Sequence, residues 1–440
     1  MAQSVCPNSS HPELAALRCG CGLTKDERDD PGSRLRIAYV CHYFVPEPAA
    51  PAARVHEMSR AWVAGGAQVT VLTTFPNFPT GVVPQRYRGR LVAEERLDGI
   101  RVLRTPVYAL PNRGVSPRAL NHLSFMLSSL LVGLPRLGTV DVVIASSPTL
   151  FSAVSGWLIA AIKRVPFVLE VRDLWPEAFV DVGVMRDGLL VRLLQRLAWF
   201  LYRRAARVVV VTEGFAEHLA AGGLPRARLA VIPNGGDTGF FYPEKDGQAT
   251  RTALGIDPAV FVVGYVGSHG LSHGLSAVLD AASRLPGVLF LLVGDGADRA
   301  RLVAERGRRG LGNVRMLPSV AREDVPGLYA AADVCLVPLR DVPIFRTFVP
   351  SKLFELLAAG RPIVGAVRGE ARSILERSGA ALLADPEDGA GIAAAIDRLR
   401  ADRSLRLALG RSGRAFAVRE FDRDALAQRY LALLAAVAGA

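Results

Sequence analysis

A short segment near residue 350 carries residue types that can bind a phosphate and a hydroxyl side by side. It runs Pro350-Ser351-Lys352-Leu353-Phe354-Glu355. Proline and serine suit the first turn of a helix, where N–H groups and the helix dipole attract anions. Lys352 adds a positive charge there, and Glu355, near the same side, can accept hydrogen bonds from sugar hydroxyls. The segment predicts a site for a nucleotide sugar, and an ordinary amphipathic helix is the alternative interpretation.

Two glycine-rich loops follow expected strands in the second half of the chain. The first is Gly267-Ser268-His269-Gly270-Leu271-Ser272-His273-Gly274. Its glycines let the backbone approach a ligand, and its histidines can donate hydrogen bonds to phosphate oxygens. A plain turn with solvated histidines is the alternative. The second loop, Gly294-Asp295-Gly296, only partly matches a dinucleotide fingerprint, because Arg299 stands where the third glycine belongs.

The first half of the chain has its own cluster of ionisable residues after an expected strand. The cluster is Glu170-Val171-Arg172-Asp173-Leu174-Trp175-Pro176-Glu177. Ligands of open α/β sheets bind at the carboxyl ends of strands, so this segment is a candidate catalytic or acceptor site. Structural pairing of Arg172 with a carboxylate is an equal alternative.

Composition restricts the possible partners. The chain has 440 residues, 50% of them hydrophobic, and a formal net charge of +12. This length suits two domains, and the charge favours anionic partners such as phosphates and anionic lipids. The arginines are scattered, without the aromatic-interleaved basic stripe of a nucleic-acid module, so we expect no nucleic-acid partner.

The cysteines and the N-terminal segment indicate a cytoplasmic protein. Five cysteines in a chain of this length do not suggest a disulfide framework. Residues 1–33 are polar and turn-rich, and we expect a flexible extension without a signal peptide. The spacing of Cys6, His11, Cys19 and Cys21 matches no common zinc finger. The uncharged stretch 142–162 is long enough to cross a membrane, but Ser146-Ser147-Pro148-Thr149 favours a strand, a turn and a helix instead.

Strand and helix signals alternate in two series, which predicts two doubly wound parallel-sheet domains. We expect an N-terminal domain over 34–237, a turn-rich linker over 238–257, a C-terminal domain over 258–418 and a last helix within 419–440 that packs back on the first domain. The expected strands are 35–41, 68–73, 100–105, 141–145, 167–171 and 207–211 in the first domain, and 260–266, 289–293, 314–317, 334–338, 363–366 and 381–383 in the second.

Taken together, these motifs resemble the family 4 retaining glycosyltransferases of the GT-B fold. The nearest likeness is the bacterial fucosamine-transferase-like subgroup that builds surface polysaccharides. The likeness extends from about Arg34 to Tyr430. It rests on the segments already quoted and on Tyr43-Phe44-Val45-Pro46-Glu47, Gly65-Gly66-Ala67-Gln68-Val69-Thr70 and Ile232-Pro233-Asn234-Gly235-Gly236-Asp237.

The resemblance implies a set of donor-binding residues. Glu355 matches the family's ribose-binding glutamate, and the acidic residue expected eight positions earlier is Thr347 here. The usual basic pair of the phosphate loop falls at Ser268 and His273 here, so the resemblance implies phosphate binding by Lys352, the helix N-terminus, His273 or arginines elsewhere in the chain. The implied donor set is Gly267, His273, Gly294, Val320, Thr347, Ser351, Lys352 and Glu355.

The resemblance also implies an acceptor side and a reaction. The acceptor-side set is Pro46, Glu47, Arg172, Asp173, Trp175 and Glu177, and the catalytic set is Asp173, Lys352 and Glu355. The expected reaction moves a hexosyl or N-acetylhexosaminyl group from a UDP-sugar to a saccharide or polyprenyl-linked acceptor. We expect no cofactor and no metal, because the nucleotide sugar is a substrate and no acidic pair with metal geometry appears in a matching loop.

Two other functions remain compatible with the sequence. A nucleotide-sugar epimerase would convert the donor without an acceptor, and a non-catalytic scaffold would bind the nucleotide sugar without turnover. The sequence also predicts peripheral attachment to an anionic membrane surface, because two regions place arginines beside apolar residues. In the first region, arginines from Arg86 to Arg118 precede the apolar segment 123–134. In the second region, residues 192–204, arginines alternate with leucines and aromatic residues.

Overall fold

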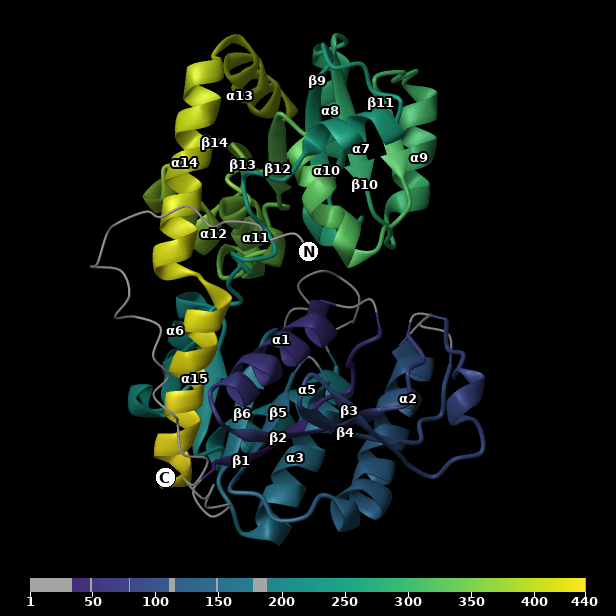
Figure 1. Cartoon of the computed structure of the whole chain (residues 1–440), viewed down its shortest axis with the longest axis vertical. Helices are drawn as coiled ribbons and strands as arrows, with labels where there is room; N and C mark the ends of the chain where they lie inside the picture. The colour runs from purple at the N-terminus through teal and green to yellow at the C-terminus, as the bar shows by residue number, and fades with distance from the viewer. Residues whose placement is uncertain are drawn as a thin grey trace, which may run out of the picture. The chain divides into compact units, whose positions relative to one another are not determined.

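The protein contains two largely parallel β-sheets, each flanked by helices (Figure 1). This computed structural model describes residues 34–47, 50–78, 80–110, 115–147, 149–176 and 188–439. The predicted α/β class with two doubly wound sheets is confirmed. Central strands are buried on both faces, as expected when helices cover each side of a parallel sheet.

The first sheet has eight strands in the order β3-β4-β2-β1-β5-β6-β7-β8. Only β3 runs antiparallel to its neighbour, β4. The strands are β1 (Arg36–Val40), β2 (Gln68–Thr74), β3 (Ala93–Leu97), β4 (Ile100–Thr105), β5 (Val142–Ser146), β6 (Phe167–Val171), β7 (Arg207–Val210) and β8 (Leu229–Val231).

Alternate strand residues of the first sheet face two separate cores. In β1, Ala38 and Val40 join the core under α2, α3, α5 and α6, whereas Ile37 and Tyr39 join the core under α1. This is the two-residue period of a strand covered on both sides. The helical elements are α1 (Ala50–Ala64), η1 (Gln85–Tyr87), α2 (Val115–Ser128), η2 (Ser129–Gly133), η3 (Leu134–Arg136), α3 (Leu150–Lys163), α5 (Leu189–Arg204), α6 (Glu213–Ala221) and η4 (Arg226–Arg228).

The second sheet has six parallel strands in the order β11-β10-β9-β12-β13-β14. They are β9 (Phe261–Val266), β10 (Val288–Val293), β11 (Val314–Leu317), β12 (Val334–Pro338), β13 (Ile363–Ala366) and β14 (Ala381–Ala384). The order reverses at β9 and β12, so the loops after β9 and β12 flank the topological switch point where open α/β sheets bind ligands.

Helices cover both faces of the second sheet as well. One core packs under α8, α9 and α13, and the other under α10, α11, α12 and α14. The helical elements are α7 (Gly247–Ala253), η5 (Leu271–His273), α8 (Ser276–Arg284), α9 (Arg299–Arg308), η6 (Arg322–Asp324), α10 (Val325–Ala331), η7 (Pro343–Arg346), α11 (Ser351–Ala358), α12 (Gly369–Ser378), α13 (Gly389–Ala401), α14 (Arg403–Glu420) and α15 (Arg423–Ala438).

The last helix, α15, belongs to the core of the first sheet. Its Leu426 and Tyr430 are buried with Met58 and Trp62 of α1. The indole N–H of Trp62 donates to the carbonyl of Ala427 over 2.9 Å. The end of the chain therefore completes a core that begins near residue 37.

All twelve predicted strands are confirmed, and no end differs from the prediction by more than one residue. The prediction missed β3 and β8, and it described 238–257 as a turn-rich linker, although α7 lies within it. Helix α2 ends at Ser128, and the chain continues as the π-helix η2 and the 3-10 helix η3. The apolar stretch 142–162 divides into β5 and α3, and none of the described helices is long and apolar enough to cross a membrane.

Candidate functional site

The N-terminus of α11 lies beside the loop that follows β9. The helix begins at Ser351 after Pro350, with no side-chain cap. The ammonium nitrogen of Lys352 lies 3.5 Å from the ring centroid of Tyr265, the buried penultimate residue of β9. That nitrogen is buried and has no hydrogen-bond partner among the described residues. A buried lysine nitrogen without a hydrogen-bond acceptor is costly, so this position is suited to an anionic ligand.

Burial also changes the charge of Lys352. It lowers the pKa of the amine to about 7, although the nearby Glu355 carboxylate acts in the opposite direction. At neutral pH the group therefore lies near its titration midpoint. An incoming diphosphate would favour the charged form, so Lys352 can gain its charge when the ligand binds.

Two glycines keep side chains out of this space. A Cβ at Gly267 would lie 2.6 Å from the Lys352 nitrogen, and a Cβ at Gly294 would lie 1.9 Å from the carbonyl oxygen of Gly267. Both glycines have positive φ angles, +141° and +148°, which other residues rarely adopt. The loops after β9 and β10 can therefore bring backbone close to Lys352 and to a ligand.

Glu355 lies on the same helix but has a protein partner of its own. The hydroxyl of Tyr329, on α10, donates to its Oε2 over 2.9 Å. Burial raises the pKa of Glu355, while this hydrogen bond and the charges of Arg322 and Lys352 oppose the shift. Tyr329 thus holds the carboxylate in one orientation, which suits an acceptor for a ribose diol.

The loop histidines are neutral. Burial lowers the pKa of His269 to about 4 and that of His273 to about 3, and the Lys352 charge adds to both effects. Both ring nitrogens of His269 are buried without a partner in the described structure, as is Nδ1 of His273. These rings can exchange single hydrogen bonds with a ligand, but they supply no positive charge.

The other donor-side residues are less closely connected to Lys352. Thr347 lies at the end of η7, and its hydroxyl donates to the carbonyl of Ile344 over 2.8 Å. Val320 is exposed in the loop after β11. Ser351 is the first residue of α11. Gly267, Lys352 and Glu355 thus form the centre of the candidate site.

On the first sheet, Asp173 and Arg172 lie directly after β6. Burial raises the pKa of Asp173 to about 6, and the Arg172 charge opposes this shift. Arg172 is buried and donates to the carbonyl of Pro51 over 3.4 Å, while its Nε has no partner among the described residues. Trp175 is half-buried, and its backbone N–H donates to the backbone carbonyl of Asp173. Glu177 lies outside the described residues.

Glu47 and Pro46 lie in the loop after β1. Pro46 is exposed, whereas the Glu47 carboxylate is buried. Its Oε1 accepts hydrogen bonds from the N–H groups of Asn77 and Phe78 at 2.8 and 2.9 Å. The carboxylate therefore ties the loop after β1 to the loop after β2, and that contact is structural.

Sequence reasoning did not identify Tyr265 and Tyr329 as parts of the site. Each lies far along the chain from α11, and a tyrosine in an apolar segment looks like any core aromatic. The one available signal was that Tyr265 lies two residues before Gly267, the first residue of the glycine-rich loop. Across the part of the chain that the structure describes, no three His, Cys, Asp or Glu side chains gather so that they could hold a metal ion.

Two family models match the chain. Residues 50–235 match a glycosyl transferase 4-like domain, and residues 259–402 match the glycosyl transferases group 1. The first range covers the first sheet, and the second contains β9 to β14 with Lys352 and Glu355. Together the two models match well over half of the chain.

Individual relatives support the same assignment. The chain is 27% identical over 313 residues to the putative colanic acid biosynthesis glycosyl transferase WcaI of Escherichia coli K12, covering 69% of this chain and 76% of that protein. It is 31% identical over 242 residues to the lipopolysaccharide core biosynthesis glycosyltransferase LpsE of Rhizobium meliloti, covering 54% and 66%.

A solved structure with the same fold is Alr3699/HepE of Anabaena in complex with UDP and glucose. The TM-score is 0.68 at 21% sequence identity, and the match covers 91% of this chain and 100% of that one. At this identity the likeness establishes the fold alone. With the two family models, it shows that the chain belongs to the glycosyltransferases of the GT-B fold that combine a 4-like domain with a group 1 domain.

Proposed function

We propose that this glycosyltransferase moves a sugar, with retention of configuration, from a UDP-sugar to a saccharide or polyprenyl-linked acceptor. The observation that carries the proposal is the Lys352 amine, buried without an acceptor beside Gly267 and the open N-terminus of α11. A diphosphate supplies the negative charge that this arrangement lacks. Glu355, held by Tyr329, then accepts hydrogen bonds from the ribose hydroxyls.

The same residues can stabilise the leaving group. As the bond between the sugar C1 and the diphosphate oxygen breaks, negative charge grows on the diphosphate. The Lys352 ammonium and the helix dipole stabilise that charge more in the transition state than in the ground state. The acceptor oxygen bonds to C1 from the same face, and its proton passes to the departing diphosphate. This route needs no strong protein base.

Asp173 is the proposed orienting group for the acceptor hydroxyl. Its raised pKa, about 6, leaves it mostly ionised at neutral pH and able to accept a hydrogen bond. Arg172 and Trp175, its neighbours after β6, belong to the same proposed acceptor side. Glu177 and Pro46 complete that set, whereas Glu47 acts by holding the loop.

The proposed donor is inferred from the similarity of this chain to other glycosyltransferases. HepE, which shares the fold, was solved with UDP and with UDP-glucose. WcaI and LpsE are named for colanic acid and lipopolysaccharide core synthesis. These names support a role in surface polysaccharide or glycolipid synthesis. We also propose a hexosyl or N-acetylhexosaminyl donor and membership of the fucosamine-transferase-like subgroup, for which the support is the resemblance of the sequence motifs. We further propose that transfer needs no metal.

In the proposed function, each of the two domains binds one substrate. Residues 34–237 take the acceptor and 258–418 take the donor, with 238–257 as the connection and 419–440 as a helix that returns to the first domain. The enzyme would work in the cytoplasm, attached peripherally to the inner face of the membrane where a polyprenyl-linked acceptor lies.

Mass spectrometry of reaction products tests the proposal. The protein is incubated with UDP-glucose, UDP-galactose and their N-acetylamino forms, each with and without lipid-linked and saccharide acceptors, in buffer containing a chelator. Transfer predicts UDP and a glycosylated acceptor only when both substrates are present. A changed donor sugar without an acceptor indicates an epimerase, and binding without any product indicates a scaffold.

A further inference from the structure

Three helical stretches that cover one face of the first sheet contain no acidic residue. They are 115–136 (α2, η2 and η3), 150–164 (α3 and the next residue) and 189–207 (α5 to the start of β7). Their basic residues are Arg118, Arg136, Lys163, Arg164, Arg192, Arg196, Arg203, Arg204 and Arg207. We call this surface the acid-free face.

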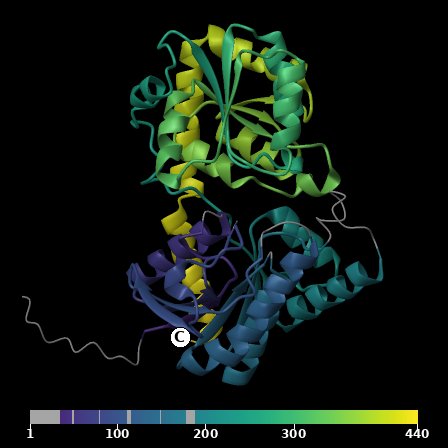
Figure 2. The same cartoon turned by 90° about the vertical axis from the view of Figure 1, so that its right-hand side faces the viewer.

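The opposite side of the same sheet differs. There α1 carries Glu57 and α15 carries Asp424. The absence of acidic residues is therefore not a property of every helix in this arginine-rich chain. It holds for α2, α3 and α5, where α2 packs on α3 and α3 packs on α5 (Figure 2), whereas α6, which covers the same core, carries Glu213 and Glu217.

The acid-free face also exposes large aliphatic side chains. Leu131 is 75% exposed, Leu189 is 74% exposed, and Ile162 is 60% exposed. The full set is Leu120, Leu123, Leu127, Leu131, Ile162, Leu189, Leu190 and Leu193. Other apolar residues of the same helices, such as Phe125 and Leu201, point into the core, but these eight do not. Single exposed leucines are ordinary, but this many on one layer indicates an interaction surface.

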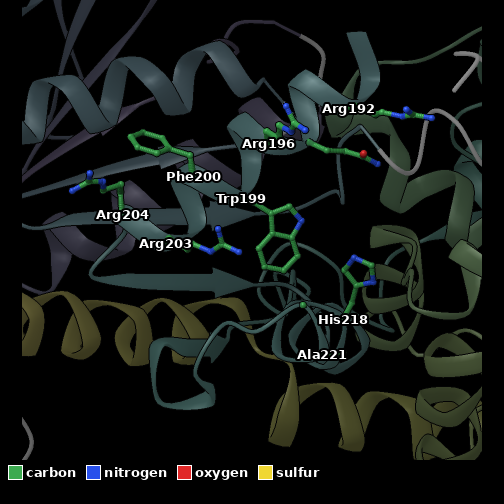
Figure 3. A pocket seen from close by; sticks show the side chains of 10 residues that line it. Arg192, Arg196, Trp199, Phe200, Arg203, Arg204, His218 and Ala221 are labelled. Carbon is green, nitrogen blue, oxygen red and sulfur yellow. The ribbon is translucent and has the colours of Figure 1, made fainter. Parts of the chain in front are cut away.

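A groove beside this face adds aromatic and basic groups. It has a volume of about 980 Å³ and lies between α5 and α6 (Figure 3). The Arg203 guanidinium lies 5.7 Å from the Trp199 ring and that of Arg204 lies 5.2 Å from the Phe200 ring. Arg192 and Arg196 also line the groove. Guanidinium groups above aromatic rings at the edge of an apolar surface are suited to lipid phosphates at the membrane interface.

Some of the arginines that the sequence suggested for membrane contact are paired with acidic residues in the structure. Of the arginines between 86 and 118, Arg101 pairs with Glu94, and Arg104 is buried and pairs with Glu95. Those two lie on β4 and are neutralised by β3. Two of the arginines expected to form a basic region there are therefore paired, and basic charge beside exposed apolar side chains is carried by α2, η3, α3 and α5.

We propose that the acid-free face docks on a bilayer containing anionic lipid. The exposed leucines enter the interface, and the arginines bind headgroup phosphates around them. A nucleic acid would use the charge but leave eight aliphatic side chains in water, and a second copy of this face would oppose like charges. This proposal deepens the proposed function by naming the surface that the enzyme binds. The binding itself is argued from the acid-free face; only its role, which is to reach a lipid-linked acceptor, rests on the proposed function.

Vesicle flotation with the full chain tests the docking. Vesicles are made of phosphatidylcholine alone or with about a third phosphatidylglycerol. Two double variants are compared with the parent: Arg196→Gln with Arg203→Gln, and Leu190→Gln with Leu193→Gln. Each arginine removed should lower partitioning onto anionic vesicles by about fivefold. The leucine variant should lose binding at every salt concentration, whereas parent binding should weaken as salt rises.

A matched control removes exposed residues of the same types elsewhere. Arg308→Gln with Arg411→Gln, on α9 and α14, and Leu407→Gln, on α14, should bind vesicles like the parent. UDP binding by calorimetry should be unchanged in all variants, because none touches Lys352 or Glu355. Equal binding to neutral and anionic vesicles, no binding to either at low salt, or equal losses in test and control variants would overturn the proposal. Failure of UDP binding in the parent would instead count against the proposed function.

Discussion

At the scale of single residues, the lowered pKa of Lys352 predicts that diphosphate binding is coupled to proton uptake. Burial lowers its pKa to about 7, so above that pH the amine in the free protein is mostly neutral. A bound diphosphate favours the ammonium and raises this pKa. Below about pH 7 the charge is already present, and binding needs no extra proton; above it, each binding event takes one up.

UDP affinity should therefore fall as pH rises. Between about pH 7 and 8.5 we expect a decrease of about tenfold, approaching tenfold per pH unit at the upper end. Calorimetry in buffers of different ionisation enthalpy measures both the affinity and the proton uptake. Lys352→Met should bind weakly with a flat profile across this range, and uridine should show no such slope with the parent. A flat UDP profile with the parent protein would refute the linkage.

Glu355 and its partner Tyr329 make a second prediction at this scale. Glu355→Ala removes a charge-assisted bond to the ribose, worth about 1.5–3 kcal/mol, so UDP affinity should fall at least about tenfold. Tyr329→Phe leaves the carboxylate in place but without its 2.9 Å hydrogen bond, and should cost less. Titration with UDP and with 2′-deoxy-UDP separates the effects. If Glu355→Ala binds UDP like the parent while remaining folded, the carboxylate does not hold the ribose.

Thr347 shows what the sequence could and could not reveal about residues. Lys352 and Glu355 were identifiable because they are three positions apart on one helix, and this spacing places their side chains on neighbouring parts of the helix surface. The environment of Thr347 was not, because its hydroxyl bonds to Ile344 within its own turn. Likewise, the carboxylate of Glu47 could be read as a site group until its backbone partners at Asn77 and Phe78 were known. Contacts between distant segments decide the role of such residues.

At the scale of elements, the loops after β9 and β10 depend on glycine. Gly294→Ala places a Cβ 1.9 Å from the Gly267 carbonyl oxygen and imposes a φ of +148° on alanine. Gly312→Ala is the matched control, because a Cβ there meets nothing within 4 Å. We expect Gly294→Ala to lower stability by about 1–3 kcal/mol and to weaken UDP binding, with little change in the control. Denaturant titration and calorimetry check both, and equal behaviour of the two variants would contradict the close approach.

The elements that the sequence missed share a physical cause. Strand β3, Ala93-Glu94-Glu95-Arg96-Leu97, lies at the sheet edge and has one buried residue, so it shows no apolar pattern. Strand β8 has three residues, and α7, with no buried residue, has no apolar face. Buried parallel strands, by contrast, are continuous apolar runs that the sequence displays directly. Elements that bury little surface leave little trace in a sequence.

At the scale of the whole molecule, the last helix makes the first sheet depend on the end of the chain. Trp62 is fully buried against α15, with its ring centroid 5.2 Å from that of Tyr430. Trp62→Ala removes this contact and leaves a cavity, so it should lower the free energy of unfolding by about 3–5 kcal/mol. Val303→Ala, at an exposed residue of α9, is the control and should change stability little. Denaturant midpoints measure both, and a midpoint for Trp62→Ala close to that of the parent would show that α15 contributes little.

A crystal structure with UDP bound tests the central claim most directly, because it shows where the diphosphate lies. We expect the phosphates at the N-terminus of α11, with a phosphate oxygen about 2.7–3.2 Å from the Lys352 nitrogen and the ribose hydroxyls hydrogen-bonded to Glu355. UDP bound away from α11, or the Lys352 nitrogen still over the Tyr265 ring without a phosphate contact, would contradict it.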